Sequence, residues 1–362
     1  MRKLHASFLL TGAVSIAVLE LAAIAGYQSY QQKYIEYVSY ENKLTHHPKH
    51  VVMLAIDGLA AYALQKATIP NIRYMMEHGA YKLDVRSELP NSSAGNWATI
   101  LLGTGPENHG IVDQPLTNIH HSVYIDEAKL AKQTSIFGLI HQSNLDAGWL
   151  ATHEKIQTAF VSLLGVQSTA LSPDFKAYGQ NFIDYYYQTN TKEDSIERYL
   201  DVLEHQIDPA KPSFSWMYFL DPDDTGHSRE YNSEEYYQAL TKTDQQIGMI
   251  INKLKAKQMY DDTLFIINSD HGGLSQYHGR PNIPEMTVPW IVYSKKDILQ
   301  SGVIPDGIKV YDSAPTIAYL MDLKDYWART TSGDKKWQGK PIVSPFFPKP
   351  EKEGYPIDGK NI

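Results

Sequence analysis

Short, uninterrupted apolar runs separated by segments of helical spacing restrict the fold of this sequence more than any other feature. Strands buried on both faces are predicted at residues 51–56 (VVMLAI), 213–220 (SFSWMYFL), 263–269 (TLFIINS) and 288–294 (VPWIVYS). Polar and apolar alternation predicts another strand at residues 81–89, and residues 146–152 are predicted to begin one more. Helices are predicted at residues 69–79, 96–103, 135–143, 192–207 and 233–257. This alternation predicts an α/β fold, a three-layer αβα sandwich with a mostly parallel central sheet.

Charge and cysteine usage exclude several classes of function. The formal net charge of −8 argues against a nucleic-acid duplex held on a basic surface. The sequence contains no cysteine, which excludes disulfides, thiolate nucleophiles and cysteine-based zinc sites. Any metal ion must therefore be held by histidine and carboxylate side chains.

The N-terminus has the pattern of an export signal. Basic residues Arg2 and Lys3 precede an apolar run at residues 8–19, and Ala23-Ile24-Ala25 has the small-x-small pattern of a cleavage site. We therefore expect residues 1–27 to be a signal peptide or an N-terminal membrane anchor, with the protein exported to the periplasm, the extracellular space or the outer side of the cytoplasmic membrane. Membrane contact is expected only through this segment, if it stays uncleaved.

The rest of the chain is predicted to hold one large domain between two polar segments. Residues 28–48 are expected to be a linker, residues 49–345 the folded domain, and residues 346–362 a tail rich in proline and lysine.

Four predicted strands are each followed by a residue that can bind a metal or act as a nucleophile. Asp57 follows the first strand, Ser93 follows the strand at residues 81–89, Asp223 follows Phe219 closely, and Asp270 with His271 follows residues 263–269. In open α/β sheets, sites form beyond the carboxyl ends of the strands. A single aspartate would be explained as a helix cap, but four strand ends together favour a shared site.

The spacing of further histidines enlarges this inventory. His227 lies four residues after Asp223, with Gly226 expected to allow a tight turn, and His278 follows His271 by a short loop. Three aspartates and three histidines suit Zn²⁺, or Mn²⁺ and similar ions. Six ligands exceed one tetrahedral site, so two divalent cations are expected, of the kind that stabilise the entering and leaving oxygens of a phosphoryl displacement.

The arrangement resembles the alkaline phosphatase superfamily, and within it the type I phosphodiesterase/nucleotide pyrophosphatase group. The matching motifs, in chain order, are AIDGL, SAGNWATILLGTGPENHGI, DPDDTGH, SEEYYQALTKTDQQIG, SDHGG and HGRPNIPEMTVPWIVYS. The resemblance covers roughly residues 49–341. It implies an alkaline phosphatase-like catalytic domain at residues 49–345 and a metal-dependent phosphoric ester hydrolase.

The resemblance also implies roles for individual residues. Ser93 would be the nucleophile at a helix N-terminus, where free N–H groups favour an anion, and Asn96 would donate a hydrogen bond to a non-bridging phosphoryl oxygen. Ser92 is the rival nucleophile, and Ser93 could instead act as a helix cap. Trp97 is expected to pack in the core. One metal ion would be held by Asp57, Asp270, His271 and the Ser93 oxygen, and the other by Asp223, His227 and His278.

Several activities fit the same centre. The resemblance favours cleavage of a phosphodiester or pyrophosphate bond in a small phosphoester such as a nucleotide, through a covalent phospho-seryl intermediate. A phosphomonoesterase or a phosphotransferase remains an alternative. Ala94-Gly95 stands where the family often has an aromatic-proline pair, so the sequence does not define the pocket for the leaving group. A sulfatase is less favoured because Ser93-Ala94-Gly95 lacks the Cys/Ser-x-Pro/Ala-x-Arg setting that formylglycine requires, and a non-catalytic surface binding protein is less favoured because all six ligands are present.

Overall fold

A computed structural model describes residues 44, 46–113, 123–163, 180–323 and 337–346. The chain divides into two compact units between Thr45 and His46, and all helices and strands of the described residues belong to the second, His46–Ile362. The predicted signal segment lies outside the described residues, as does nearly all of the predicted linker and tail. His47, within the predicted linker, has its Nδ1 2.9 Å from the Leu320 carbonyl oxygen.

The centre of this unit is an eight-stranded sheet with the order β10-β2-β9-β8-β1-β7-β5-β6. Its strands are β1 (His50–Ile56), β2 (Ala80–Arg86), β5 (Gln157–Leu163), β6 (Tyr185–Thr189), β7 (Ser213–Phe219), β8 (Thr263–Asn268), β9 (Thr287–Ser294) and β10 (Gly302–Val303). Neighbouring strands run parallel except where β9 pairs with β8 and β2. A small hairpin of β3 (Ile111–Asp113) and β4 (Val123–Ile125) lies outside this sheet.

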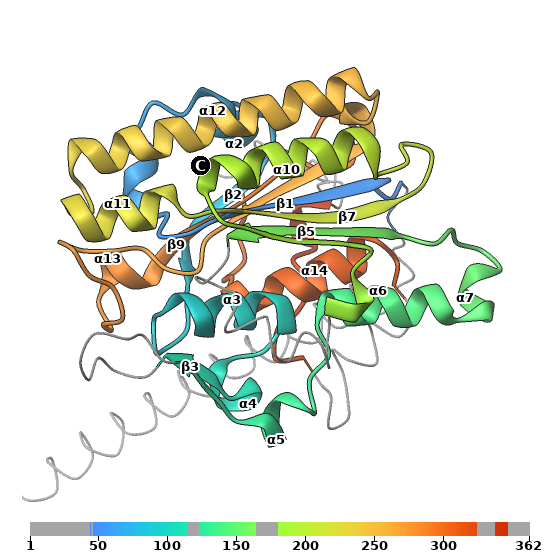
Figure 1. The fold of residues 1–362 in the computed structure, drawn as a ribbon, viewed down its shortest axis with the longest axis horizontal. Coiled ribbons are helices and arrows are strands. Elements are labelled where there is room, and N and C mark those ends of the chain that lie inside the picture. Colours follow the sequence, from blue (N-terminus) through green and yellow to red (C-terminus); the bar gives the residue numbers. More distant parts are fainter. Residues whose placement is uncertain (1–43, 45, 114–122, 164–179, 324–336, 347–362) are drawn as a thin grey trace, which may run out of the picture. The chain divides into compact units, whose positions relative to one another are not determined.

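Helices cover both faces of the sheet (Figure 1). One layer holds α2 (Pro70–His78), α10 (Lys192–His205), α11 (Asp221–Arg229) and α12 (Glu234–Ala256), and the other holds α3 (Ser93–Leu102), α6 (Ile136–Leu145) and α14 (Ser313–Leu320). Short helices are α4 (Pro106–His109), α5 (Glu127–Leu130), α7 (Ala147–Leu150) and α13 (Ile283–Met286). The predicted α/β sandwich with a mostly parallel sheet is confirmed.

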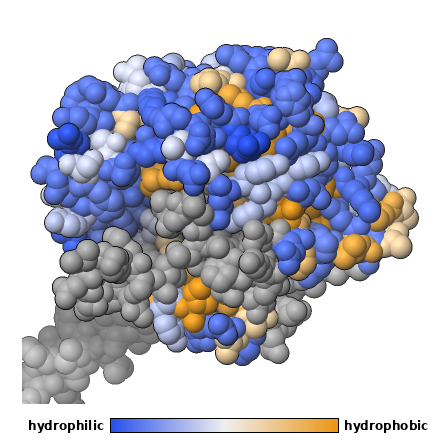
Figure 2. Space-filling view, in the orientation of Figure 1, coloured by the Kyte–Doolittle hydropathy of each residue, from blue (hydrophilic) through white to orange (hydrophobic). Residues whose placement is uncertain are grey.

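Local sequence explains where the covering helices begin and how they pack. Ser233 caps α12 by accepting a hydrogen bond from the Tyr236 backbone N–H, and Thr191 caps α10 in the same way through Asp194. Leu240 and Ile247 of α12 lie two turns apart and are fully buried against the sheet. The visible outer face is mainly hydrophilic, with hydrophobic residues in small groups (Figure 2).

Two local predictions are wrong. Residues 146–152 do not begin a strand, because Asp146 accepts the Trp149 N–H at 2.8 Å and starts the short helix α7; the strand β5 starts only at Gln157. Gly226 does not form a tight turn but lies inside α11. Among the described residues, no helix is both long and apolar enough to cross a membrane.

Candidate metal centre

Three adjacent strands of the sheet, β8, β1 and β7, bring ligand-type side chains to one edge. Asp57 is the residue after β1, while Asp270 and His271 follow β8. Asp223 and His227 lie on α11, which begins two residues after β7 ends. Because the three strands run parallel, their carboxyl ends meet at the same edge, as the sequence predicted.

Asp57, Asp270 and His271 form the first cluster. Their ligand atoms all lie within 4.8 Å of one another, and all three side chains are fully buried. The Nε2 atom of His271 is 3.4 Å from Asp57 Oδ1 and 3.2 Å from Asp270 Oδ2. The structure therefore brings together the three protein side chains predicted for one cation.

The electrostatics of this cluster fit a bound cation. Burial raises the pKa of the Asp57 carboxyl, and the neighbouring Asp223 raises it further. Burial raises the pKa of Asp270 well above its ordinary value, with further contributions from Asp57 and Asp223. Among the described residues, the buried Oδ2 of Asp270 has no hydrogen-bond partner. Buried carboxylates this close repel one another when ionised, and either protonation or a bound cation relieves this repulsion.

The second cluster is more exposed. Ligand atoms of Asp223, His271 and His278 lie within 4.8 Å of one another, so His271 adjoins both groups. His227, predicted for this site, has its Nε2 3.5 Å from Asp223 Oδ2 and 3.1 Å from His278 Nε2. The rings of His271 and His278 stack with centroids 3.6 Å apart. Burial, followed by the charges of His271 and His227, lowers the pKa of His278 well below its ordinary value.

All three imidazoles are oriented by backbone carbonyl groups. The Nδ1 atoms of His227, His271 and His278 lie 2.8, 2.9 and 3.0 Å from the carbonyl oxygens of Gln276, Gly272 and Asn91. A carbonyl oxygen only accepts, so each Nδ1 must donate. Each neutral ring then keeps the lone pair of Nε2 for a cation, which is the arrangement found around metal-bound histidines.

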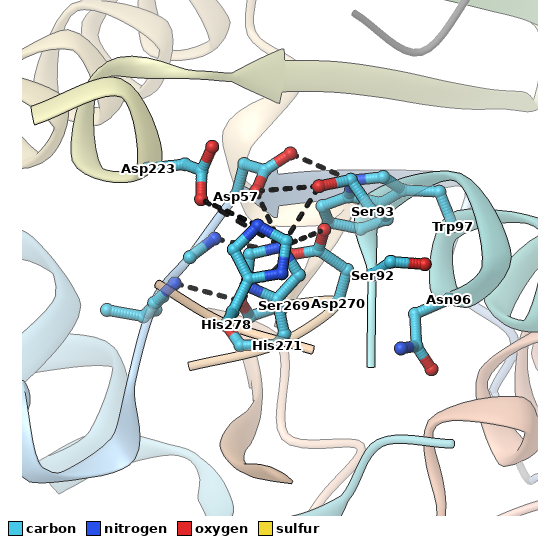
Figure 3. A network of polar contacts seen from close by, with 12 residues as sticks. Asp57, Ser92, Ser93, Asn96, Trp97, Asp223, Ser269, Asp270, His271 and His278 are labelled. Carbon is cyan, nitrogen blue, oxygen red and sulfur yellow. Dashed lines mark hydrogen bonds and ion pairs between the residues drawn. The ribbon is translucent and has the colours of Figure 1, made fainter. Parts of the chain in front are cut away.

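Ser93, not Ser92, faces the clusters (Figure 3). Ser93 is the first residue of α3, and its Oγ lies 2.9 Å from His271 Nε2 and 3.5 Å from Asp57 Oδ1. Ser92 occupies the cap position, and its Oγ approaches only the Pro90 carbonyl oxygen at 3.5 Å. The cap is thus the neighbouring residue, which leaves the Ser93 hydroxyl directed at the acidic groups.

Asn96 lies in the first turn of α3, and its side chain bonds to the loop that precedes the helix. Its Oδ1 accepts the Glu88 N–H at 2.8 Å, and its Nδ2 donates to the Glu88 carbonyl at 3.1 Å and to Asn91 Oδ1 at 3.4 Å. The side chain is fully buried and its amide points away from Ser93 (Figure 3). Asn96 thereby ties the preceding loop to α3, and its hydrogen bond to a phosphoryl oxygen stays a prediction.

Three aromatic residues hold the carboxylates, and sequence reasoning did not assign them this role. Trp97 Nε1 donates to Asp57 Oδ2 at 3.1 Å, and the Tyr218 hydroxyl donates to the same oxygen at 2.5 Å. The Tyr231 hydroxyl donates to Asp223 Oδ1. Trp97 was expected only to pack. Among 25 tyrosines, only the place of Tyr218 just before a strand end could have drawn attention to it.

Comparison with known proteins identifies the family. The family model for type I phosphodiesterase/nucleotide pyrophosphatase matches residues 51–279, well over half of the chain and a range that includes every predicted ligand. Mouse ectonucleotide pyrophosphatase/phosphodiesterase family member 3 is 25% identical over 227 residues, covering 61% of this chain and 24% of the relative. The chain thus spans about a quarter of the length of the curated relatives that it matches.

Solved structures share the fold. Murine ectonucleotide pyrophosphatase/phosphodiesterase 5, an inactive variant in complex with AMP, matches with a TM-score of 0.56 at 16% identity, covering 76% of this chain and 95% of that chain. A sulfatase from Pseudoalteromonas sp. matches with a TM-score of 0.56 at 16% identity, covering 83% and 72%. At these identities the likeness concerns the fold alone.

Proposed function

This chain belongs to the type I phosphodiesterase/nucleotide pyrophosphatase family, and from this premise we propose that it is an exported, metal-dependent hydrolase of phosphodiester or pyrophosphate bonds. Ser93 is the nucleophile of this proposal. Asp57, Asp270 and His271 hold one divalent cation together with the Ser93 oxygen, and the second is held by Asp223, His227 and His278. Zn²⁺ is the favoured ion, with Mn²⁺ or a similar ion as the alternative.

One observation carries the proposal: a serine hydroxyl at the start of a ten-residue helix lies against the first ligand cluster. Ser93 Oγ is within 3.5 Å of both Asp57 and His271. The first-turn N–H groups of α3 have no acceptor within the helix, so they favour a phosphoryl group bound next to Ser93.

The chain's own residues then account for a two-step displacement. Ser93 Oγ forms a bond to phosphorus while the bond from phosphorus to the leaving oxygen breaks, and the hydroxyl proton passes through solvent to that leaving oxygen. Water later cleaves the phospho-serine and restores the hydroxyl. When bound, the cations would lower the pKa of the serine hydroxyl and neutralise charge on the phosphoryl oxygens.

Relatives support a nucleotide-like substrate. The mouse relative is named for nucleotide pyrophosphatase and phosphodiesterase activity, and the murine structure contains AMP. For this chain we propose a small phosphoester of this class, with monoester hydrolysis or phosphoryl transfer as alternatives on the same centre. Export is proposed from the basic and apolar pattern of residues 1–27.

A substrate panel tests the proposal. Purified protein supplied with Zn²⁺ or Mn²⁺ is assayed against nitrophenyl phosphodiester, phosphomonoester and sulfate substrates. The diester should be cleaved fastest, a chelator should stop turnover, and the metal should restore it. A preference for the monoester or the sulfate would replace the proposed reaction class by that alternative.

A pair of neighbouring serines provides the matched control. Ser93→Ala should lower kcat by at least about 10³-fold while metal content stays close to that of the wild type. Ser92→Ala should retain turnover, because its hydroxyl approaches only a backbone carbonyl. Retained activity in Ser93→Ala would remove Ser93 from its role.

A further inference from the structure

We propose that Tyr231 is a positioning residue whose hydroxyl sets how tightly the second ligand group, Asp223, His227 and His278, holds its cation. This inference rests on the proposed function, because it takes these three side chains as ligands of a divalent ion. Tyr231 lies just beyond the end of α11, and no sequence pattern there indicated a role at the site.

Tyr231 is in direct contact with a predicted ligand of the second group. Tyr231 is buried, and its hydroxyl donates to Asp223 Oδ1. The other oxygen of this carboxylate, Oδ2, lies 3.5 Å from His227 Nε2. Among the described residues, Tyr231 is the one hydrogen-bond donor to Asp223. The phenol therefore fixes the rotation of a carboxylate that must present its oxygens to the ion.

Two glycines lie so close to the Tyr231 ring that neither position has room for a side chain. A Cβ atom at Gly226 would lie 2.6 Å from ring atoms of Tyr231, and a Cβ atom at Gly273 would lie 2.3 Å from them. Gly226 belongs to the helix that carries Asp223, and Gly273 follows His271 by two residues. Both ligand-bearing segments are thus shaped to receive this side chain.

The backbone has positive φ angles on both sides of Tyr231. Glu230 and Asn232 have φ angles of +85° and +74°, in the left-handed region, which asparagine adopts more readily than other residues with a Cβ atom but glutamate seldom adopts. Between them, the Tyr231 N–H donates to the Ser275 carbonyl at 2.6 Å, on the loop that leads to His278. This unfavourable backbone turn places the phenol between α11 and the loop that leads to His278.

The two ligand groups differ in how well they are held. Asp57 has donors from Trp97 and Tyr218 and is fully buried. The second group is more open, since the His227 side chain is 41% exposed. Removing the Tyr231 hydroxyl should therefore weaken the second ion selectively, which a general loss of stability would not do.

The test is metal retention in Tyr231→Phe, which keeps the ring and removes only the hydroxyl. Protein loaded with Zn²⁺ is dialysed against a graded series of chelator concentrations, and zinc per chain is measured by elemental analysis. The wild type should lose its ions in two steps. The ion held by Asp223, His227 and His278 should leave in the first step, and the ion held by Asp57, Asp270 and His271 in the second. In the variant, the first step should move to about 10- to 100-fold lower chelator concentration while the second step stays unchanged.

Two further variants complete the design. Tyr199→Phe removes another buried tyrosine hydroxyl, which bonds to Ser215 within the core, and should leave both steps unchanged. Gly273→Ala forces the Tyr231 ring to move and should reproduce the selective loss of the ion held by Asp223, His227 and His278. Thermal unfolding of each variant shows that it is folded.

The outcomes separate this inference from the proposed function. If the first ion loss occurs at the wild-type chelator concentration in both Tyr231→Phe and Gly273→Ala, the proposed role of Tyr231 is wrong. The two-cation proposal would be unaffected. Equal weakening of both steps, or the same weakening in Tyr199→Phe, would show a merely structural effect and also overturn it. A wild-type protein that holds fewer than two ions would end the inference and the two-cation proposal together.

Discussion

Replacing Trp97 by phenylalanine should weaken the metal-loaded protein more than the same change at Trp290, and the excess should arise from charge. Both side chains are fully buried. Trp97 donates to the Asp57 carboxylate at 3.1 Å, whereas Trp290 donates to the neutral hydroxyl of Ser313 at 3.2 Å. The two substitutions therefore differ mainly in the charge of the acceptor.

The magnitudes follow from these contacts. Each change removes two buried ring carbons, which together contribute about 1.6 kcal/mol. Each acceptor keeps a second donor, Tyr218 on Asp57 and Asn268 on Ser313, so neither is left without a partner. A hydrogen bond to a neutral acceptor contributes about 1 kcal/mol and one to a charged acceptor about 2 kcal/mol. The free energy of unfolding should fall by about 3.6 kcal/mol at Trp97 and about 2.6 kcal/mol at Trp290.

Urea unfolding followed by circular dichroism measures this difference at neutral pH. The Zn²⁺ concentration must be fixed, because binding to the folded state adds to the free energy of unfolding. Equal losses in the two variants, or a larger loss at Trp290, would refute the charge argument. The excess should also disappear in chelator-treated protein at acid pH, because burial raises the pKa of Asp57 and its carboxyl is then neutral.

Three other changes test separate parts of the structure. Asp57→Asn should lower the zinc content per chain, and an unchanged content by elemental analysis would count against its role as a ligand. Burial raises the pKa of Asp312 from 3.8 to about 7, so the folded protein holds a proton that the unfolded chain releases. The stability that this protonation contributes is therefore present in acid and lost as pH rises from 3.8 to about 7. Urea midpoints should fall over this pH range, and the fall should be smaller in Asp312→Asn. Trp337 is buried against Gly103, so Trp337→Ala should lower the free energy of unfolding by about 3–5 kcal/mol. An unchanged urea midpoint would contradict that packing.

The sequence alone was sufficient for the layers of the fold and for the place of the site. Apolar runs such as residues 51–56 predict buried strands because a strand covered on both faces needs apolar side chains at every position. The residue after such a run, Asp57 for example, then lies at the carboxyl edge whatever the order of the strands. That rule is local in sequence, so Asp223, Asp270 and His271 could be assigned to one edge before any contact was known.

The partners of individual strands and side chains had to come from the tertiary structure. A local pattern does not specify that β9 runs antiparallel, that Asn96 turns its amide to Glu88, or that Tyr218 and Tyr231 reach the carboxylates. Tyr218 reaches Asp57 across 161 positions of the chain, and a side chain's partner at that separation depends on how whole elements pack. The sequence gives the functional group of each residue, whereas three-dimensional packing determines which residues contact one another.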